Sequence, residues 1–529
     1  MTKISQATNA PSAGRAKSRV PMVLAASTVA LVVTLAGNAA TSPSSGPFAQ
    51  SNAAPGPPPG GPPGGPGGPG GPGGPGGGGP GGTTGGGPGG GTTAGPTGGG
   101  GGSTTGSSAN SQTFPDATGE TTTISMTGPA PATDPFFTPL GTNGRACVTC
   151  HVAATGWTIT PAQVQGRFEQ TNGTDPIFRI VDGSNSPLAS VATVQEREAA
   201  YSMLLTRGVI RIGLPIPSGA DFTLTAVDDP YHFASASQLS LFRRPLPTTD
   251  LKFLSTVMWD GRETAANGTI TGDLGHQAID AVLSHEQGTT SPSTGTVNQI
   301  VSFESGLYSA QSVDDIAGAL NAPPAQGGPT VLSGQNYFAG INSPGTASFD
   351  PHVFTIYNGW AGNAARPTPT VAQQESIARG EAIFNTRQFS IENVGGLNDV
   401  LQRPIVTGTC SSCHNAPNAG SNSVGAFFDE GVVDVVRRTP DLPLYTLKDK
   451  TTGAIRQVTD PGRALVTGKF ADIGKVKVPT LRDLAARAPY FQDGSAPTTQ
   501  DVVDFYNKRF NIGLTPQDQA DLKAFLDSL

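Results

Sequence analysis

The chain contains two five-residue stretches with the same pattern, CVTCH at residues 147–151 and CSSCH at residues 410–414. Together they include all 4 cysteines of the 529-residue sequence. Cys-x-x-Cys-His is the covalent attachment signature of c-type haem, because two thiols on adjacent turns of a short helix can reach the two vinyl groups of one porphyrin. The histidine that follows then binds the iron from one face of the ring. The sequence predicts two covalently bound c-type haems, attached through Cys147, Cys150, Cys410 and Cys413 and ligated by His151 and His414.

Two other chemistries use closely spaced cysteines, a redox-active dithiol and a zinc site. An exported chain with four cysteines would also suggest disulfides. Two copies of one haem signature that together use every cysteine favour haem over a dithiol, a zinc site or disulfides. A zinc site needs four ligands, and outside the two motifs the chain has only four histidines: His232, His276, His285 and His352.

The first 40 residues have the pattern of an export segment. Four basic residues precede an apolar run of 17 residues, VPMVLAASTVALVVTLA at residues 20–36, and the small residues GNAA follow, which suits cleavage. A run of this length is also at the lower limit for crossing a bilayer. We expect residues 1–40 to be a signal peptide or an N-terminal membrane anchor. In either case the body of the protein lies in the periplasm or at the cell surface, and an anchor would tether it to the membrane.

Glycine and proline are concentrated in one segment near the N-terminus. Of the 72 glycines and 47 prolines of the chain, 30 glycines and 13 prolines lie in residues 51–110. A segment of this composition buries too little apolar surface to offset the entropy of folding. We expect residues 41–115 to be a disordered Gly/Pro-rich linker that acts as a spacer.

Acidic residues outnumber basic residues, and none of them precedes Asp116. The formal net charge of the whole chain is −7, and that of residues 116–529 is −11. Nucleic-acid-binding domains usually show basic patches, so we expect no nucleic-acid partner. A small cationic protein is a better electrostatic match for this charge.

The two haem motifs are 263 residues apart, which is too far for one small cytochrome module. We expect an N-terminal c-type haem domain at residues 116–367 and a C-terminal one at residues 368–529. Apolar spacing predicts helices at residues 371–386 and 516–529, and Thr515 would cap the second of these. The predicted fold is mainly α, with two cytochrome c-like haem domains that carry long loops.

Beyond the haem motifs, three stretches resemble the bacterial di-haem cytochrome c peroxidase/MauG family: MWDGR at 258–262, KVPTLRD at 477–483 and APYFQDG at 488–494. The resemblance runs from about residue 141 to residue 529 and includes a helix through residues 502–506 and the terminal ADLKAFL. It implies that the haem on His151 is the peroxidatic one and that the haem on His414 transfers electrons. In the family a tryptophan between the haems relays electrons. Trp259 matches it, although a large aromatic of this kind can also be a core residue.

One departure from the family concerns the first haem. Family members that need reductive activation carry a second histidine soon after the first haem motif, where it blocks the iron. Here no histidine lies between His151 and His232. The first haem would then be open at rest, as in the MauG branch, unless His232, His276 or His285 takes the blocking position.

A second departure concerns the sixth ligand of the second haem, which is methionine in many family members. No methionine follows Trp259 in this chain. Tyr506 matches the position, and a phenolate there would lower the reduction potential of the iron, whereas methionine raises it. Tyr506 could instead be a packed helix aromatic, and His352 is the main competing ligand.

Cleavage of a bound peroxide needs a group that moves a proton between its two oxygens. By the resemblance, Gln277 matches the glutamine of the family, and its glutamate falls on Glu286 or Gln287. If it falls on Gln287, His285 or Glu286 must take the acid–base role. Glu286 has a competing interpretation as a solvated surface residue.

The family also holds a calcium ion between its domains, mostly through backbone carbonyls and water. The carbonyls of Arg487 and Pro489 match that motif, and calcium prefers such oxygen ligands. Gln492 stands where the family often has histidine.

Two hypotheses of different classes follow. In the first, the chain is an exported di-haem cytochrome c peroxidase-like oxidoreductase. It reduces hydrogen peroxide with electrons from a small redox protein (a cytochrome c or a cupredoxin) or an organic donor, or performs MauG-like peroxide-dependent oxidation. In the second, it is a non-catalytic electron-transfer cytochrome with two six-coordinate haems. The missing second histidine favours the enzyme. A haem oxygenase that acts on a polymer is a third hypothesis, which no specific residue supports.

Overall fold

The computed structural model describes residues 110–265, 268–362 and 368–529. The signal peptide or anchor predicted at residues 1–40 lies outside these residues, as does most of the predicted linker. The last five residues of that linker form strand β1 (Ser111–Pro115), so the folded chain begins earlier than we expected. In the part of the chain that the structure describes, no helix has the length and apolar character needed to span a bilayer.

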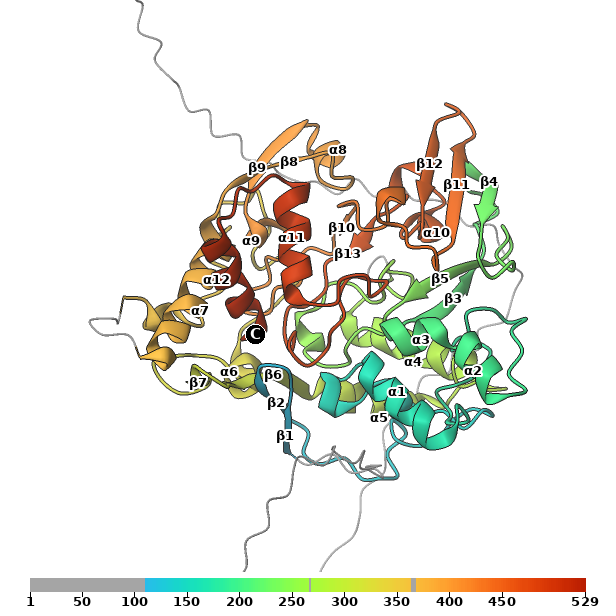
Figure 1. The fold of residues 1–529 in the computed structure, drawn as a ribbon, viewed down its shortest axis with the longest axis horizontal. Coiled ribbons are helices and arrows are strands. Elements are labelled where there is room, and N and C mark those ends of the chain that lie inside the picture. The colour runs from blue at the N-terminus through green and yellow to red at the C-terminus, as the bar shows by residue number, and fades with distance from the viewer. Residues whose placement is uncertain (1–109, 266–267, 363–367) are drawn as a thin grey trace, which may run out of the picture. The chain divides into compact units, whose positions relative to one another are not determined.

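Figure 1 shows helices α4 (Ile270–Ser284) and α5 (Thr294–Ser305) in one part of the fold and helices α7 (Pro369–Thr386), α9 (Cys410–Cys413), α11 (Thr499–Arg509) and α12 (Pro516–Asp527) in another. Helices α4 and α5 pack together near the first motif. The second motif lies on α9, which packs against α7. The other helices are α1 (Pro161–Thr171), α2 (Val194–Ala200), α3 (Ser202–Arg207), α6 (Pro329–Gly334), α8 (Asn398–Leu401) and α10 (Ala464–Thr467).

The helices predicted from apolar spacing are confirmed. Helix α7 covers residues 371–386, and α12 begins after Thr515, whose side chain accepts a hydrogen bond from the Asp518 amide at 3.1 Å. Such a cap satisfies an amide that has no partner inside the helix. The helix expected through residues 502–506 is α11, and α12 packs against both α7 and α11.

Strands make up much of the rest, so the prediction of a mainly α fold is right only in part. The strands pair antiparallel in small sheets ordered β1-β2-β6-β7, β12-β11-β4, β3-β5, β8-β9 and β10-β13. The strand residues lie outside the two stretches in which apolar spacing predicted helices. The strands after β1 are β2 (Gly119–Ser125), β3 (Ile210–Leu214), β4 (Phe222–Asp228), β5 (Leu239–Arg243), β6 (Leu307–Asp314), β7 (Gly318–Ala319), β8 (Phe389–Glu392), β9 (Ile405–Gly408), β10 (Phe427–Phe428), β11 (Leu444–Asp449), β12 (Ile455–Val458) and β13 (Val476–Lys477).

Segments from both sides of the predicted boundary at residues 367/368 share sheets and cores. Strand β4 pairs with β11, more than 200 residues later, with Tyr445 opposite Val227. The core around α7 and α12 also includes Phe354 and Tyr357, which precede the boundary. The two haem motifs are therefore held in a continuous body of packed residues, and the domain limits 116–367 and 368–529 stay a prediction.

Candidate haem sites

The first motif begins on a short 3₁₀ helix, η1 (Cys147–Thr149). The Nδ1 atom of His151 is hydrogen-bonded to the Trp157 carbonyl at 3.0 Å, so Nδ1 carries the proton and Nε2 the lone pair. Burial lowers the pKa of His151 to about 4. A neutral, oriented imidazole is the form that binds iron, so His151 fits the role of proximal ligand.

The second motif repeats this arrangement. The Nδ1 atom of His414 donates to the carbonyl of Gly420 at 2.5 Å, and burial lowers the pKa of His414 to about 4. In both motifs the accepting carbonyl lies six residues after the histidine. Burial also raises the pKa of the Cys410 thiol to about 12. The donor set at both sites fits a covalently attached haem.

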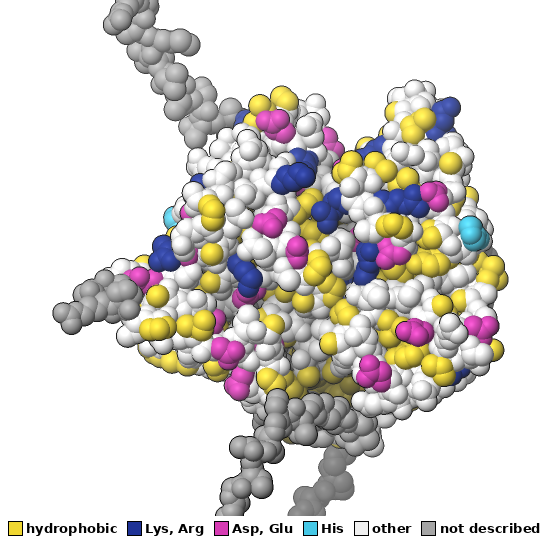
Figure 2. Space-filling view, in the orientation of Figure 1, with side chains coloured by type: hydrophobic (Ala, Val, Ile, Leu, Met, Phe, Trp, Pro, Cys, Tyr) yellow, Lys and Arg dark blue, Asp and Glu magenta, His cyan; other side chains and the backbone are white. Residues whose placement is uncertain are grey.

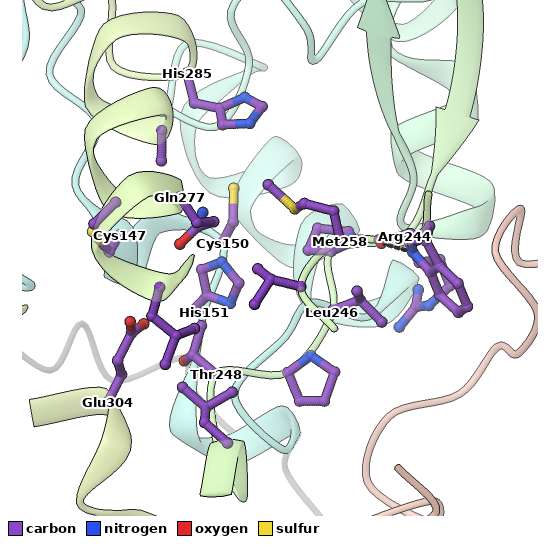
Figure 3. A pocket seen from close by; sticks show the side chains of 18 of the residues that line it. Cys147, Cys150, His151, Arg244, Leu246, Thr248, Met258, Gln277, His285 and Glu304 are labelled. Atoms are coloured by element: carbon purple, nitrogen blue, oxygen red, sulfur yellow. Dashed lines mark hydrogen bonds between the residues drawn. The ribbon is translucent and has the colours of Figure 1, made fainter. Parts of the chain in front are cut away.

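A cavity adjoins the first motif (Figure 3). Figure 3 shows Gln277 and His285 on the side of helix α4, and Glu304 on a separate helix. The cavity brings together seven residues that we predicted from the sequence: Cys147, Cys150, His151, Trp259, Gln277, His285 and Glu286.

Of the three histidines proposed to block the first iron, His285 alone lines this cavity. His232 and His276 are exposed on the surface. His285 Nδ1 is hydrogen-bonded to Asp182 Oδ2 at 2.5 Å, and Asp182 also forms a buried ion pair with Arg145. Burial alone would raise the pKa of Asp182, but Arg145 and His285 hold it below its usual value. The imidazole of His285 is therefore oriented by a fixed carboxylate, with its other nitrogen available to the cavity.

Glu286 has a structural task besides lining the cavity. Its Oε2 atom accepts hydrogen bonds from the backbone amides of Leu140 at 2.8 Å and Gly141 at 3.2 Å. It is 2% exposed, so the interpretation as a solvated surface residue is wrong. Burial raises the pKa of this carboxyl group although the two amides lower it. The neighbouring Gln287 accepts a hydrogen bond from Asn143 and does not line the cavity.

Glu304 lines the same cavity and was missed by the sequence analysis. It lies on α5, is 2% exposed, and its Oε1 atom has no hydrogen-bond partner among the described residues. Burial raises its pKa to about 8, so the side chain is a neutral acid at pH 7. The signal was present in the sequence, because Glu304 falls on the same helical face as the buried Val297 and Ile300.

Trp259 lines both the first cavity and a second one of about 1010 Å³ that contains His414. Its indole Nε1–H donates to the Arg244 carbonyl at 2.8 Å. Lys477 also lines both cavities, and its Nζ donates to the Thr256 carbonyl at 2.9 Å. Burial lowers the pKa of Lys477 to about 7. The family resemblance of its motif assigns no role to Lys477.

Tyr506 lies in the wall of the second cavity together with His414. Its hydroxyl donates to Glu430 Oε2 at 2.6 Å. Burial and the neighbouring Glu430 carboxylate raise the pKa of Tyr506 well above its usual value. His352, the competing ligand, is 61% exposed and paired with Asp350, so it lies outside this cavity. The structure thus places Tyr506 near the second motif and leaves His352 at the surface.

The residues present do not fit a calcium ion at the predicted carbonyls. The Arg487 carbonyl accepts a hydrogen bond from Arg244 Nη2 at 2.9 Å, so this oxygen already binds a cationic group. Among the described residues, no cluster of three or more acidic, histidine or cysteine side chains could hold a metal. Pro489 lines the second cavity.

Comparisons with known proteins support the family. No family model matches the chain. It is 30% identical over 140 residues to cytochrome-c peroxidase IdrP1 of Pseudomonas sp. (strain SCT), covering 23% of this chain and 36% of that protein. It is 32% identical over 121 residues to cytochrome c551 peroxidase of Pseudomonas aeruginosa (23% and 30%). It is 40% identical over 89 residues to cytochrome c peroxidase Ccp of Escherichia coli K12 (16% and 19%). The matches thus span about a third or less of the length of these relatives.

A solved structure, that of a MauG-like protein associated with microbial copper homeostasis, overlaps 56% of this chain and 76% of its own. Its sequence identity is 18% and the TM-score is 0.30, which is too low to support a shared fold. The sequence matches carry the assignment instead. The relatives found by sequence are cytochrome c peroxidases, which are oxidoreductases, and this agrees with the family that the motifs resemble.

Proposed function

We propose that the chain is an exported di-haem oxidoreductase that reduces hydrogen peroxide at the haem on His151, or uses peroxide for MauG-like oxidation. One observation carries the proposal: two Cys-x-x-Cys-His motifs place carbonyl-anchored, neutral histidines at two cavities that share Trp259. This arrangement suits a reaction at one haem supplied with electrons through the other.

The haems, when bound, supply the redox chemistry. The protein supplies proton control in the first cavity, where reduction of peroxide to water consumes two protons and two electrons. Glu304 holds a proton on a carboxyl group with an unpaired Oε1, so it can donate to an oxygen in the cavity. Gln277 can orient the peroxide by hydrogen bonding, and His285, oriented by Asp182, can exchange a second proton.

The second cavity is proposed to receive electrons. Tyr506 would help to hold the haem of this cavity, and Glu430, which accepts the hydrogen bond of the Tyr506 hydroxyl, would accept its proton. Trp259 relays electrons between the two cavities. On the face shown in Figure 2, basic side chains stand among acidic ones and apolar side chains, which suits a small redox protein or an organic donor better than a nucleic acid.

The location is proposed from the sequence. Residues 20–36 would direct export, as a cleaved signal or as a membrane tether, and the Gly/Pro-rich residues would separate that segment from the folded enzyme in the periplasm or at the cell surface.

The optical and electron paramagnetic resonance spectra of the purified ferric protein test the proposal, recorded before and after hydrogen peroxide. We expect one high-spin haem that changes rapidly with peroxide and one low-spin haem. Two low-spin haems that ignore peroxide, both in the ferric and in the half-reduced protein, would instead establish the electron-transfer cytochrome. His285→Ala distinguishes a blocked from an open first haem, because it should change the spin state only if His285 ligates iron.

A further inference from the structure

Arg244 lies directly after strand β5 and is 5% exposed. Its guanidinium is enclosed by backbone carbonyls from three separate segments. Nη2 donates to the carbonyls of Ile159 at 2.7 Å and Arg487 at 2.9 Å, and Nη1 donates to that of Arg207 at 3.0 Å. These oxygens converge on one buried positive charge.

This cation has no anionic partner. Among the described residues, no salt bridge joins Arg244 to a carboxylate, whereas the adjacent Arg243 forms buried ion pairs with Asp260 at 2.6 Å and Asp460 at 2.7 Å. Burial and the nearby Arg487 charge lower the pKa of Arg244 to about 9. A positive charge surrounded by neutral carbonyl oxygens is the environment that proteins offer to hard metal cations.

The main chain of Arg244 connects this cage to the haem cavities. Its amide donates to the Gln492 carbonyl at 2.7 Å, and its carbonyl accepts from the Trp259 indole at 2.8 Å. Arg244 also lines both cavities. The Arg244 side chain therefore holds residues 159, 207 and 487 together, while its main-chain carbonyl positions Trp259.

Arg244 and a calcium ion exclude each other at this place. Calcium binds oxygen at about 2.3–2.6 Å and takes six to eight such ligands. An ion on the Arg487 carbonyl would share that oxygen with a guanidinium nitrogen only 2.9 Å away. Two cations bound to one buried oxygen repel each other strongly, because the protein interior screens their charges weakly.

We propose that the Arg244 guanidinium takes the place of a bound calcium ion among the carbonyls of Ile159, Arg207 and Arg487. The chain would then position Trp259 between its two cavities without a metal. The proposal does not rest on the peroxidase activity. It makes two demands: the wild-type protein must be indifferent to calcium, and removal of the guanidinium must leave a carbonyl cage that accepts calcium.

The first test uses the full-length holoprotein. After dialysis against EGTA, elemental analysis should find far less than one calcium per chain, and the melting midpoint should be the same in EGTA and in excess CaCl₂. One tightly held calcium per chain, or a midpoint that falls in EGTA, would overturn the proposal.

The second test uses Arg244→Asn, which removes the charge and offers a side-chain oxygen. We expect its melting midpoint to fall in EGTA and to rise by about 5 °C in a large excess of calcium, but not of potassium. The matched control is Arg211→Asn. Arg211 is 4% exposed and donates to the Val181 carbonyl, which is not one of the carbonyls around Arg244. Calcium should therefore not raise the melting midpoint of this variant.

If Arg244→Asn binds no calcium, or if Arg211→Asn regains stability with calcium equally, the proposal is wrong. If Arg244→Asn does not fold, Arg244→Lys tests the proposal instead. The lysine keeps the charge but reaches fewer carbonyls, so this variant should be less stable than wild type and still indifferent to calcium. A calcium-dependent Arg244→Lys variant would contradict the proposal.

Discussion

The cavities beside His151 and His414 use the same proximal arrangement but differ in their other polar groups. Both histidines donate Nδ1–H to a carbonyl six residues later. In the first cavity the buried acid Glu304 keeps an oxygen without a hydrogen-bond partner among the described residues. In the second the polar pair is closed on itself, because the Tyr506 hydroxyl donates to Glu430.

This difference separates two kinds of chemistry. An acid with an unpaired oxygen can give its proton to a molecule that enters the cavity. A hydrogen-bonded phenol–carboxylate pair holds one side chain in place beside the haem motif, with its hydroxyl proton already engaged. The first cavity is thus suited to proton-coupled reaction with a small molecule, and the second to ligation and electron transfer.

The largest expected effect comes from removing one attachment site at a time. Cys147→Ser with Cys150→Ser, and Cys410→Ser with Cys413→Ser, should each halve the covalent haem, measured by the pyridine haemochrome assay. The peroxide-induced spectral change should disappear in the first variant only. A change that survives there and disappears in the second variant would reverse the roles of the two cavities.

Glu304→Gln should slow peroxide consumption by about 10²–10⁴-fold, because the amide fills the same space but cannot donate a proton. Stopped-flow measurement of the peroxide-induced spectral change gives this rate. Glu286→Gln is the control, since that carboxylate is engaged by the amides of Leu140 and Gly141. Should Glu286→Gln slow the reaction more than Glu304→Gln, the proton donor has been assigned to the wrong residue.

Stability should depend on pH through Glu304. Its pKa is raised from 4.5 to about 8 in the folded protein, so between these values the folded state keeps a proton that the unfolded state has lost. The free energy of unfolding therefore falls as pH rises from about 4.5 to about 8, in total by a few kcal/mol. Denaturant titrations should show a weaker fall in Glu304→Gln. Identical pH profiles for the two proteins would rule out a buried neutral Glu304.

Tyr506→Phe should have the smallest effect on stability, about 1–3 kcal/mol, because it leaves the half-buried Glu430 carboxylate without the hydroxyl that donates to it. If Tyr506 ligates the second iron, the low-spin electron paramagnetic resonance signal should also change. Phe505→Leu, on the same helix, serves as a control for packing. An unchanged low-spin signal in Tyr506→Phe would show that Tyr506 is only a neighbour of the haem.

The sequence pattern predicted well those features that depend on residues close together in the chain. The haem motifs, the α7 and α12 helices and the Thr515 cap belong to this group, because bond geometry and helical periodicity act over a few residues. The sheets were missed, since strand β4 finds its partner β11 more than 200 residues later. No periodicity within either strand identifies that partner.

The candidate haem sites also combine features set by nearby residues with features set by the fold. Motif spacing predicts the cysteines and histidines of both haem sites, and that assignment stays a prediction. Tertiary structure decided which other residues reach them. It brought His285 to the first cavity and left His232 and His276 at the surface, and it buried Glu304 without a partner.

The calcium prediction shows why sequence matching was insufficient there. Backbone carbonyls are the same in every residue, so the motif around Arg487 and Pro489 could not reveal what its oxygens bind. Arg244 is 243 residues away from Arg487 along the chain, and only folding brings its guanidinium to that carbonyl. The spacing of residues in the sequence thus predicts local chemistry. The partners of a buried charge depend instead on which distant segments pack around it.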